Sequence, residues 1–199
     1  KVCYRNSSYV ARGEEEFKSL ALGNHIPAPT VMVRKECHNL LGGYDERYPQ
    51  VSDWEMWLRM VLHYDIAFVS EPLAYHREHE TNLTKVSYHR NTWGMEHYIM
   101  LRNLFSSLPP EKGHLAYLEQ EAVRETAKRV LWHSVTTSLS NRKTGLARRN
   151  IALAVAIDDS LLRDIKTYGF FALTLLGKRV YSISRYLYKR IMRERPRAL

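Results

Sequence analysis

Cysteine is scarce in this sequence of 199 residues, which contains only Cys3 and Cys37. Two cysteines are too few for a disulfide framework, so a reducing compartment is the expected environment. Neither residue belongs to a Cys-x-x-Cys pair, so the sequence gives no sign of a cysteine-based zinc site.

Long apolar runs are also missing. The most apolar segment, Tyr168–Leu176 (YGFFALTLL), is much shorter than the ~20 residues that a membrane-spanning helix needs. Two interpretations fit it: a core helix, or an amphipathic helix whose basic neighbours rest on an anionic membrane surface. The sequence does not open with a basic region followed by an apolar one, so we expect no signal peptide.

Acidic residues are rare at the carboxyl end. The formal net charge of the chain is +9. From Arg163 onward, ten Lys or Arg stand against Asp164 and Glu194, which gives +8 and leaves little excess elsewhere. Because the positive charge is confined to one end of the chain, the sequence does not indicate an extended nucleic-acid-binding surface. Three late tyrosines apart, aromatic residues are not interleaved with the basic ones in a stacking pattern, so we expect no nucleic-acid partner.

The first 85 residues predict short helices and strands. Helices are expected at 14–22, at 35–41 and from Ser52 onward, where Ser52 and Glu55 have the spacing of a capping box. Apolar, often β-branched runs predict strands, at 30–33, 65–70 and 73–77. Three short strands make a thin sheet, and the expected fold class of this region is α/β.

After about residue 85 the pattern is helical throughout. Apolar residues recur at helical spacing in five segments separated by turns, namely 88–105, 111–139, 146–157, 161–176 and 178–193. We therefore expect two regions, an α/β region over 1–85 and an all-helical region over 86–199.

Between residues 17 and 84, short motifs follow one another closely. In chain order they read TVMVRK from Thr30, GGYDE from Gly42, SDWEMWLR from Ser52, IAFV from Ile66 and EPLAYHREH from Glu71. This ordered set resembles the acceptor-side half of a family 2 glycosyltransferase with the GT-A fold. The resemblance implies a partial GT-A half-domain over 1–85. The helical remainder resembles the variable C-terminal extension of many such enzymes.

Enzymes of this family transfer a sugar from a nucleotide-sugar donor to an acceptor hydroxyl, usually with inversion. A base takes the acceptor proton, and a divalent cation offsets charge on the leaving diphosphate. The resemblance makes Asp53 the catalytic base, in a motif that usually has two adjacent acids. Here the first of the two is Ser52, which can only hydrogen-bond. Alternatively, both residues merely begin a helix, where the helix dipole would lower the Asp53 pKa.

The same resemblance suggests two further roles. His79, and less closely His76, match a segment whose histidine in some GT-A enzymes ligates the metal or touches the diphosphate. Either residue could instead be a surface histidine in a loop. Trp54 is a candidate platform for a sugar ring or a core residue, whereas helical spacing favours a core position for Trp57.

Charged residues near this segment have open interpretations as well. Asp45 and Glu46 could line the acceptor pocket, or they could be ordinary solvated acids of a loop. Arg59 is expected to form a salt bridge at the rim of the core and not to bind phosphate.

The nucleotide-binding half of the family has no counterpart here, since its Asp-x-Asp-like metal motif and any glycine-rich phosphate loop are missing. The chain also begins with Lys1 instead of Met. We therefore expect a fragment of an inverting glycosyltransferase that is inactive alone. Its divalent cation, Mn or Mg, would be held mainly by the missing half.

The resemblance also implies partners and a place of action. The partners are a nucleotide-sugar donor and a glycan or lipid-linked acceptor in polysaccharide assembly. The expected location is cytoplasmic. Independently of the resemblance, the basic residues of the C-terminal helices suggest peripheral contact with the inner face of the plasma membrane. The alternative is a non-catalytic module derived from the same fold, which binds glycans or docks on a membrane or partner.

Overall fold

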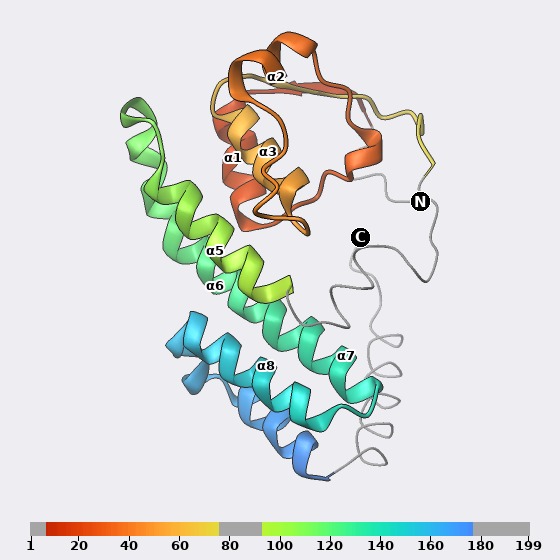
Figure 1. Cartoon of the computed structure of the whole chain (residues 1–199), viewed down its shortest axis with the longest axis vertical. Coiled ribbons are helices and arrows are strands. Elements are labelled where there is room, and N and C mark those ends of the chain that lie inside the picture. Colours follow the sequence, from red (N-terminus) through yellow and green to blue (C-terminus); the bar gives the residue numbers. More distant parts are fainter. Residues whose placement is uncertain (1–6, 76–92, 177–199) are drawn as a thin grey trace. The chain divides into compact units, whose positions relative to one another are not determined.

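A computed structural model of the chain describes residues 7–75 and 93–176 (Figure 1). The chain divides into two compact units, Lys1–Thr126 and Ala127–Leu199. The boundary between them lies further along the chain than the one expected after residue 85.

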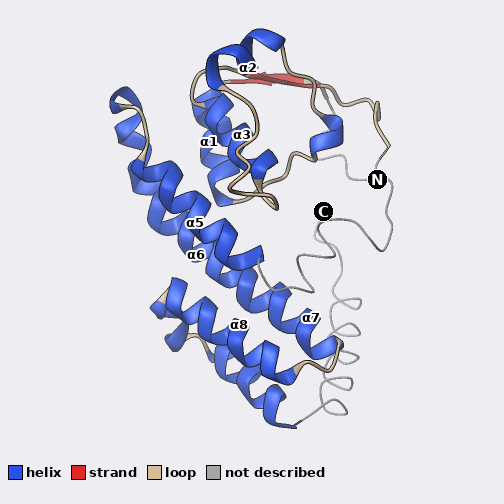
Figure 2. Cartoon of the chain, in the orientation of Figure 1, coloured by secondary structure: helices blue, strands red, loops and turns tan. Residues whose placement is uncertain are grey.

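The first unit consists mainly of helices (Figure 2). Its α-helices are α1 (Gly13–Leu22), α2 (Lys35–Leu41), α3 (Ser52–Val61), α5 (Trp93–Ser106) and the beginning of α6 (Glu119–Arg129). Its strands are β1 (Tyr9–Ala11) and β2 (Ile66–Phe68), and two 3-10 helices cover Ala28–Thr30 and Pro110–Leu118. The helices predicted at 14–22, 35–41 and from Ser52 are confirmed.

The core of this unit is formed by helices. Helix α3 packs against α1, α2 and α5, and α1 also contacts the 3-10 helix Pro110–Leu118. The largest fully buried side chains include Trp54, Phe17 and Met100, one from each of α3, α1 and α5. Helix α3 turns one apolar face to this core, because Trp54, Leu58 and Val61 are all buried at helical spacing.

The sheet is small and lies outside this core. In the described part of the chain it contains two antiparallel three-residue strands, with Tyr9 opposite Phe68 and Ala11 opposite Ile66. The predicted fold class, an α/β partial GT-A half-domain, is therefore wrong, since helices and not a sheet form the core. The strand expected at 65–70 is confirmed in shorter form as β2.

The segment expected to form a strand at 30–33 shows why the sheet is smaller. Pro29 lies inside the 3-10 helix Ala28–Thr30, where the amides of Thr30 and Val31 donate to the carbonyls of Pro27 and Ala28. These donors are no longer available for a ladder, and Met32 is 99% exposed. Of the strand expected at 73–77, the described residues 73–75 form no strand, and residues 76 and 77 lie outside the described part.

The long helix expected over 111–139 is divided into several segments. A 3-10 helix, Pro110–Leu118, precedes α6, and a π-helical turn, Val130–Ser134, leads into α7 (Val135–Ser140). Proline fits the first turn of a helix, which explains a helical start at Pro110. The sequence pattern was apolar at helical spacing throughout, and periodicity alone does not distinguish these helix types.

The second unit is helical throughout its described residues. It contains the π-helical turn, α7, α8 (Thr144–Ile157), a 3-10 helix (Asp159–Arg163) and a helix over 165–176. Asn150 of α8 donates its amide to Ser138 of α7 at 3.1 Å. Across the described helices, length and apolar character nowhere suffice for crossing a membrane.

Gly13, the first residue of α1, sits where two helices approach most closely. Its amide donates to Asp65 Oδ1 at 2.8 Å, so a distant carboxylate satisfies one of the free N–H groups at the start of α1. A Cβ at this position would overlap the backbone oxygens of Val61 and Tyr64. Backbone cannot move aside as a flexible side chain can, so only glycine fits here.

Gly13→Ala should therefore destabilise the first unit by about 1–3 kcal/mol, the usual cost of overpacking. The measurement is the free energy of unfolding in urea, followed by far-UV circular dichroism. Gly113→Ala is the matched control, because a Cβ at Gly113 meets no atom within 4 Å. Equal stability of the two variants would contradict the close approach at Gly13.

Candidate functional site

The candidate site lies at the start of α3, around Asp53. The Asp53 side chain is half-buried, and its Oδ1 accepts the amide of Trp54 at 2.6 Å. The Asn24 side chain, just after α1, acts on this carboxyl as well and lowers its pKa. Asn24 is itself oriented by the amide of Ile26, which donates to Asn24 Oδ1 at 3.0 Å. The Trp54 amide thus holds the carboxyl, and a residue from the segment after α1 favours its ionised form.

Burial dominates the electrostatics of this carboxyl. Loss of water around Asp53 raises its pKa above the ordinary value, and the hydrogen bonds from Trp54, from the Asp53 amide and from Asn24 oppose this only in part. The expected lowering of the pKa at a helix start is therefore wrong. A raised pKa moves a carboxylate toward the range in which it acts as a general base near neutral pH.

The helix start is not stabilised by the predicted capping box. The N-cap residue is Val51, which makes no side-chain cap, and Glu55 forms an ion pair with Arg59. Instead, Glu96 of α5 accepts the amides of Gln50 and Val51 at 2.5 and 3.2 Å. A carboxylate that is distant in sequence thus satisfies the free donors before α3, and its burial raises the Glu96 pKa.

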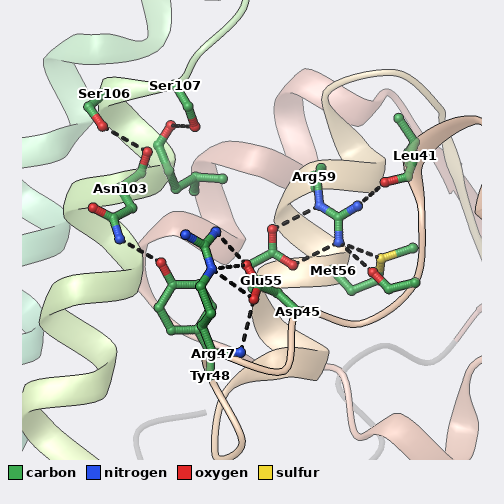
Figure 3. A network of polar contacts seen from close by, with 12 residues as sticks. Leu41, Asp45, Arg47, Tyr48, Glu55, Met56, Arg59, Asn103, Ser106 and Ser107 are labelled. Carbon is green, nitrogen blue, oxygen red and sulfur yellow. Dashed lines mark hydrogen bonds and ion pairs between the residues drawn. The ribbon is translucent and has the colours of Figure 1, made fainter.

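The loop before α3 is fixed at its first end by Arg59 (Figure 3). Arg59 Nη2 donates to the Gly43 carbonyl at 2.9 Å, and Nη1 donates to the Leu41 carbonyl. The same guanidinium binds Glu55 through two hydrogen bonds of 2.8 Å. The salt-bridge role expected for Arg59 is confirmed. Gly42 makes the turn possible, because its φ of 84° disfavours residues with a Cβ.

Further along, the same loop is held by two more contacts (Figure 3). The Asp45 carboxylate pairs with Arg47 at 2.7 Å, and this partner lowers the Asp45 pKa. The hydroxyl of buried Tyr48 accepts a hydrogen bond of 2.6 Å from Asn103 of α5. Asp45 is therefore occupied by an ion pair, whereas Glu46 is exposed to solvent.

Trp54 lies inside the core. It is 1% exposed, and its indole N–H donates to the Leu20 carbonyl near the end of α1 at 2.8 Å. Its ring packs against His97, with ring centroids 5.1 Å apart. No face of this ring is open to a sugar. The core position expected for Trp57 is confirmed, since it is buried as well.

The histidines proposed for metal or diphosphate binding, His76 and His79, lie outside the described residues. Over 7–75 and 93–176, no group of three or more His, Cys, Asp or Glu side chains could hold a metal ion.

Three residues of the site were not predicted from the sequence. Asn24 belongs to no motif in the sequence, and Glu96 lies within the helical pattern expected over 88–105. His25 forms a third unexpected contact, with Nε2 2.7 Å from Oε1 of buried Glu16. The pair lies beside Asn24 in the chain. Glu96 and Asn24 act over long sequence separations, which local patterns do not reveal.

In comparisons with known proteins, no family model matches the chain, and no curated protein or solved structure shows significant similarity to it.

The raised pKa makes Asp53 a destabilising residue at neutral pH. Below its ordinary pKa the carboxyl is protonated in both states and contributes no difference. As the pH rises, the unfolded chain loses the proton first, so the free energy of unfolding falls until the folded-state pKa is passed. Asp53→Asn should therefore be more stable than the wild type at pH 7, by on the order of 0.5 kcal/mol.

The measurement is urea denaturation of both proteins between pH 3 and pH 7. The difference should vanish at the acidic end and grow with pH. A variant that is less stable than the wild type at pH 7 would show that ionised Asp53 stabilises the fold.

Proposed function

We propose that the first unit carries the acceptor side of an inverting sugar-transfer site, with Asp53 as the catalytic base. The observation that carries the proposal is the half-buried Asp53 carboxyl, whose pKa is raised by burial. The ordered motifs from Thr30 to His79 supply the reaction class through their resemblance to family 2 glycosyltransferases. The proposal relies on these residues and not on a GT-A sheet.

In the proposed reaction, the Asp53 carboxylate accepts the proton of an acceptor hydroxyl. The acceptor oxygen then bonds to the anomeric carbon while the bond from that carbon to the diphosphate oxygen breaks. A base with a raised pKa takes up this proton more readily than an ordinary aspartate. Asn24 acts as a positioning residue, because its side chain favours the ionised carboxyl and lowers the Asp53 pKa.

The remaining assignments follow from the same resemblance. The substrates would be a nucleotide-sugar donor and a glycan or lipid-linked acceptor, on the cytoplasmic side of the membrane. Exposed Glu46 is free to meet the acceptor, whereas Asp45 would first have to leave Arg47. Trp54 has no place in this proposal as a sugar platform, since its ring is buried in the core.

Asp53→Asn in the native polypeptide should lower the rate of sugar transfer by about 10²–10⁴-fold, the usual contribution of a general base. The assay supplies a panel of nucleotide sugars with Mn²⁺ or Mg²⁺ and follows release of nucleoside diphosphate and labelled product. Donor affinity, measured by calorimetry, should be unchanged. Glu36→Gln, an exposed acid on α2, is the control and should keep full activity.

Two outcomes would overturn the proposal. Asp53→Asn with near-normal turnover would show that another group takes the proton. An oligosaccharide that binds the wild-type chain without donor or metal, in the absence of any transfer, would favour the non-catalytic glycan-binding module.

Asn24→Ala tests the positioning of the base. The Asn24 hydrogen bond lowers the Asp53 pKa, so its loss should raise that pKa further. Activity requires the ionised carboxylate, and the acidic limb of the pH–rate profile should therefore move to higher pH, with a loss in kcat of about tenfold. A uniform loss of activity with an unmoved profile would indicate a purely structural role.

A further inference from the structure

The second unit ends its described part with a helix over 165–176 (Figure 1). Its side chains have an unusual distribution between buried and exposed positions. Thr167, Phe170 and Thr174 are buried, at the spacing of one helical face. The Phe170 ring packs edge-on against Trp132, with centroids 5.6 Å apart. Arg148 of α8 donates to Thr174 Oγ1 at 3.1 Å. This face fixes the helix to the rest of the unit.

The opposite face is apolar and exposed. Ile165 is 83% exposed, Tyr168 57% and Leu175 63%, and Leu176 is exposed to a similar degree. At 100° per residue these positions form one stripe along the helix, and exposed Ala172 lies within it. The solvent-exposed face of a helix normally carries polar residues. An apolar stripe at this position therefore indicates a surface that is covered by an apolar phase.

The charge of the adjacent part of the sequence distinguishes between the partners that could cover this stripe. Arg163 and Lys166 are exposed and lie next to Ile165 in the chain, and the sequence from Arg163 to the C-terminus carries a net charge of +8. A second copy would carry the same positive charge, and repulsion between like charges opposes self-association. An anionic lipid surface offers the complementary charge and an apolar layer just beneath it.

We propose that the stripe formed by Ile165, Tyr168, Ala172, Leu175 and Leu176 is a docking surface for an anionic lipid bilayer. The helix would lie in the plane of the interface, with the stripe among the upper acyl chains and basic side chains near the lipid phosphates. Each lysine or arginine near an anionic leaflet strengthens binding by about fivefold. This proposal is independent of the role of Asp53.

The test is co-sedimentation of the full 199-residue chain with vesicles of phosphatidylcholine alone or mixed 2:1 with phosphatidylglycerol. The wild type should bind the anionic vesicles at least about tenfold more strongly than the neutral ones. Ile165→Glu combined with Leu176→Glu should reduce this binding by about tenfold or more, because charged groups replace inserted apolar ones.

Met32→Glu combined with Leu73→Glu is the matched control. It also replaces two exposed apolar residues by glutamate, so the net charge changes equally, but it lies in the first unit. This pair should keep binding within about twofold of the wild type. Circular dichroism of both pairs confirms that the helices are retained.

Three results would overturn the proposal. Equal loss of vesicle binding in the two double variants would show that net charge alone attracts the protein to the vesicles. Equal binding to neutral and anionic vesicles would remove the role of the basic residues. Failure to bind vesicles, together with a wild-type dimer that Ile165→Glu/Leu176→Glu dissociates in sedimentation velocity, would assign the stripe to a second copy of the chain.

Discussion

The first unit depends on the close antiparallel contact of α1 with α3. At one end, Gly13 brings the start of α1 against the backbone oxygens of Val61 and Tyr64, and Asp65 receives its amide. At the other end, the Trp54 indole donates to the Leu20 carbonyl. At the first end, a carboxylate that follows α3 satisfies a free amide of α1. At the second end, the indole N–H adds a hydrogen bond to a carbonyl that also accepts the Gly23 amide. The two helices are therefore fixed in register as well as in distance.

This register creates the candidate site. Trp54 reaches Leu20 only when the start of α3 lies beside the end of α1, and that arrangement places Asp53 next to Asn24. The same contact removes water from the carboxyl and raises its pKa. A charge kept in such a place lowers stability at neutral pH, and a fold under selection for stability alone has no reason to retain it. The unfavourable electrostatics of Asp53 are therefore themselves an argument for a chemical role.

The sequence predicted the short helices well, because each has a clear beginning or end. The first turn of α1 is acidic, α2 ends at Gly42, and apolar residues of α3 recur at helical spacing. The strand expected at 30–33 failed because Pro29 directs its neighbours into a local turn. With that strand absent, the sheet that a GT-A half-domain requires does not form among the described residues.

The site was predictable only in part. Asp53 was selected only through the resemblance to glycosyltransferase motifs, and its catalytic role stays a prediction. The salt bridge of Arg59 follows from Glu55, which lies four residues before it on the same helix. The capping box failed because Glu55 has a stronger partner in Arg59, a guanidinium that binds it through two hydrogen bonds. Asn24 and Glu96 satisfy groups far away in sequence, and such contacts become visible only after the helices have packed.

The helix over 165–176 makes only modest contacts with the rest of its unit, and its exposed face is rich in apolar side chains. Two of its three buried residues are threonines, whose hydroxyls donate to the carbonyls of Leu161 and Phe171. A helix selected only to stabilise the unit would bury its isoleucine and leucines and expose its threonines. The inverted arrangement costs stability in water, since apolar area remains exposed. That cost is offset only when another apolar phase covers the face, and the positive charge that the sequence carries from Arg163 onward favours an anionic lipid surface.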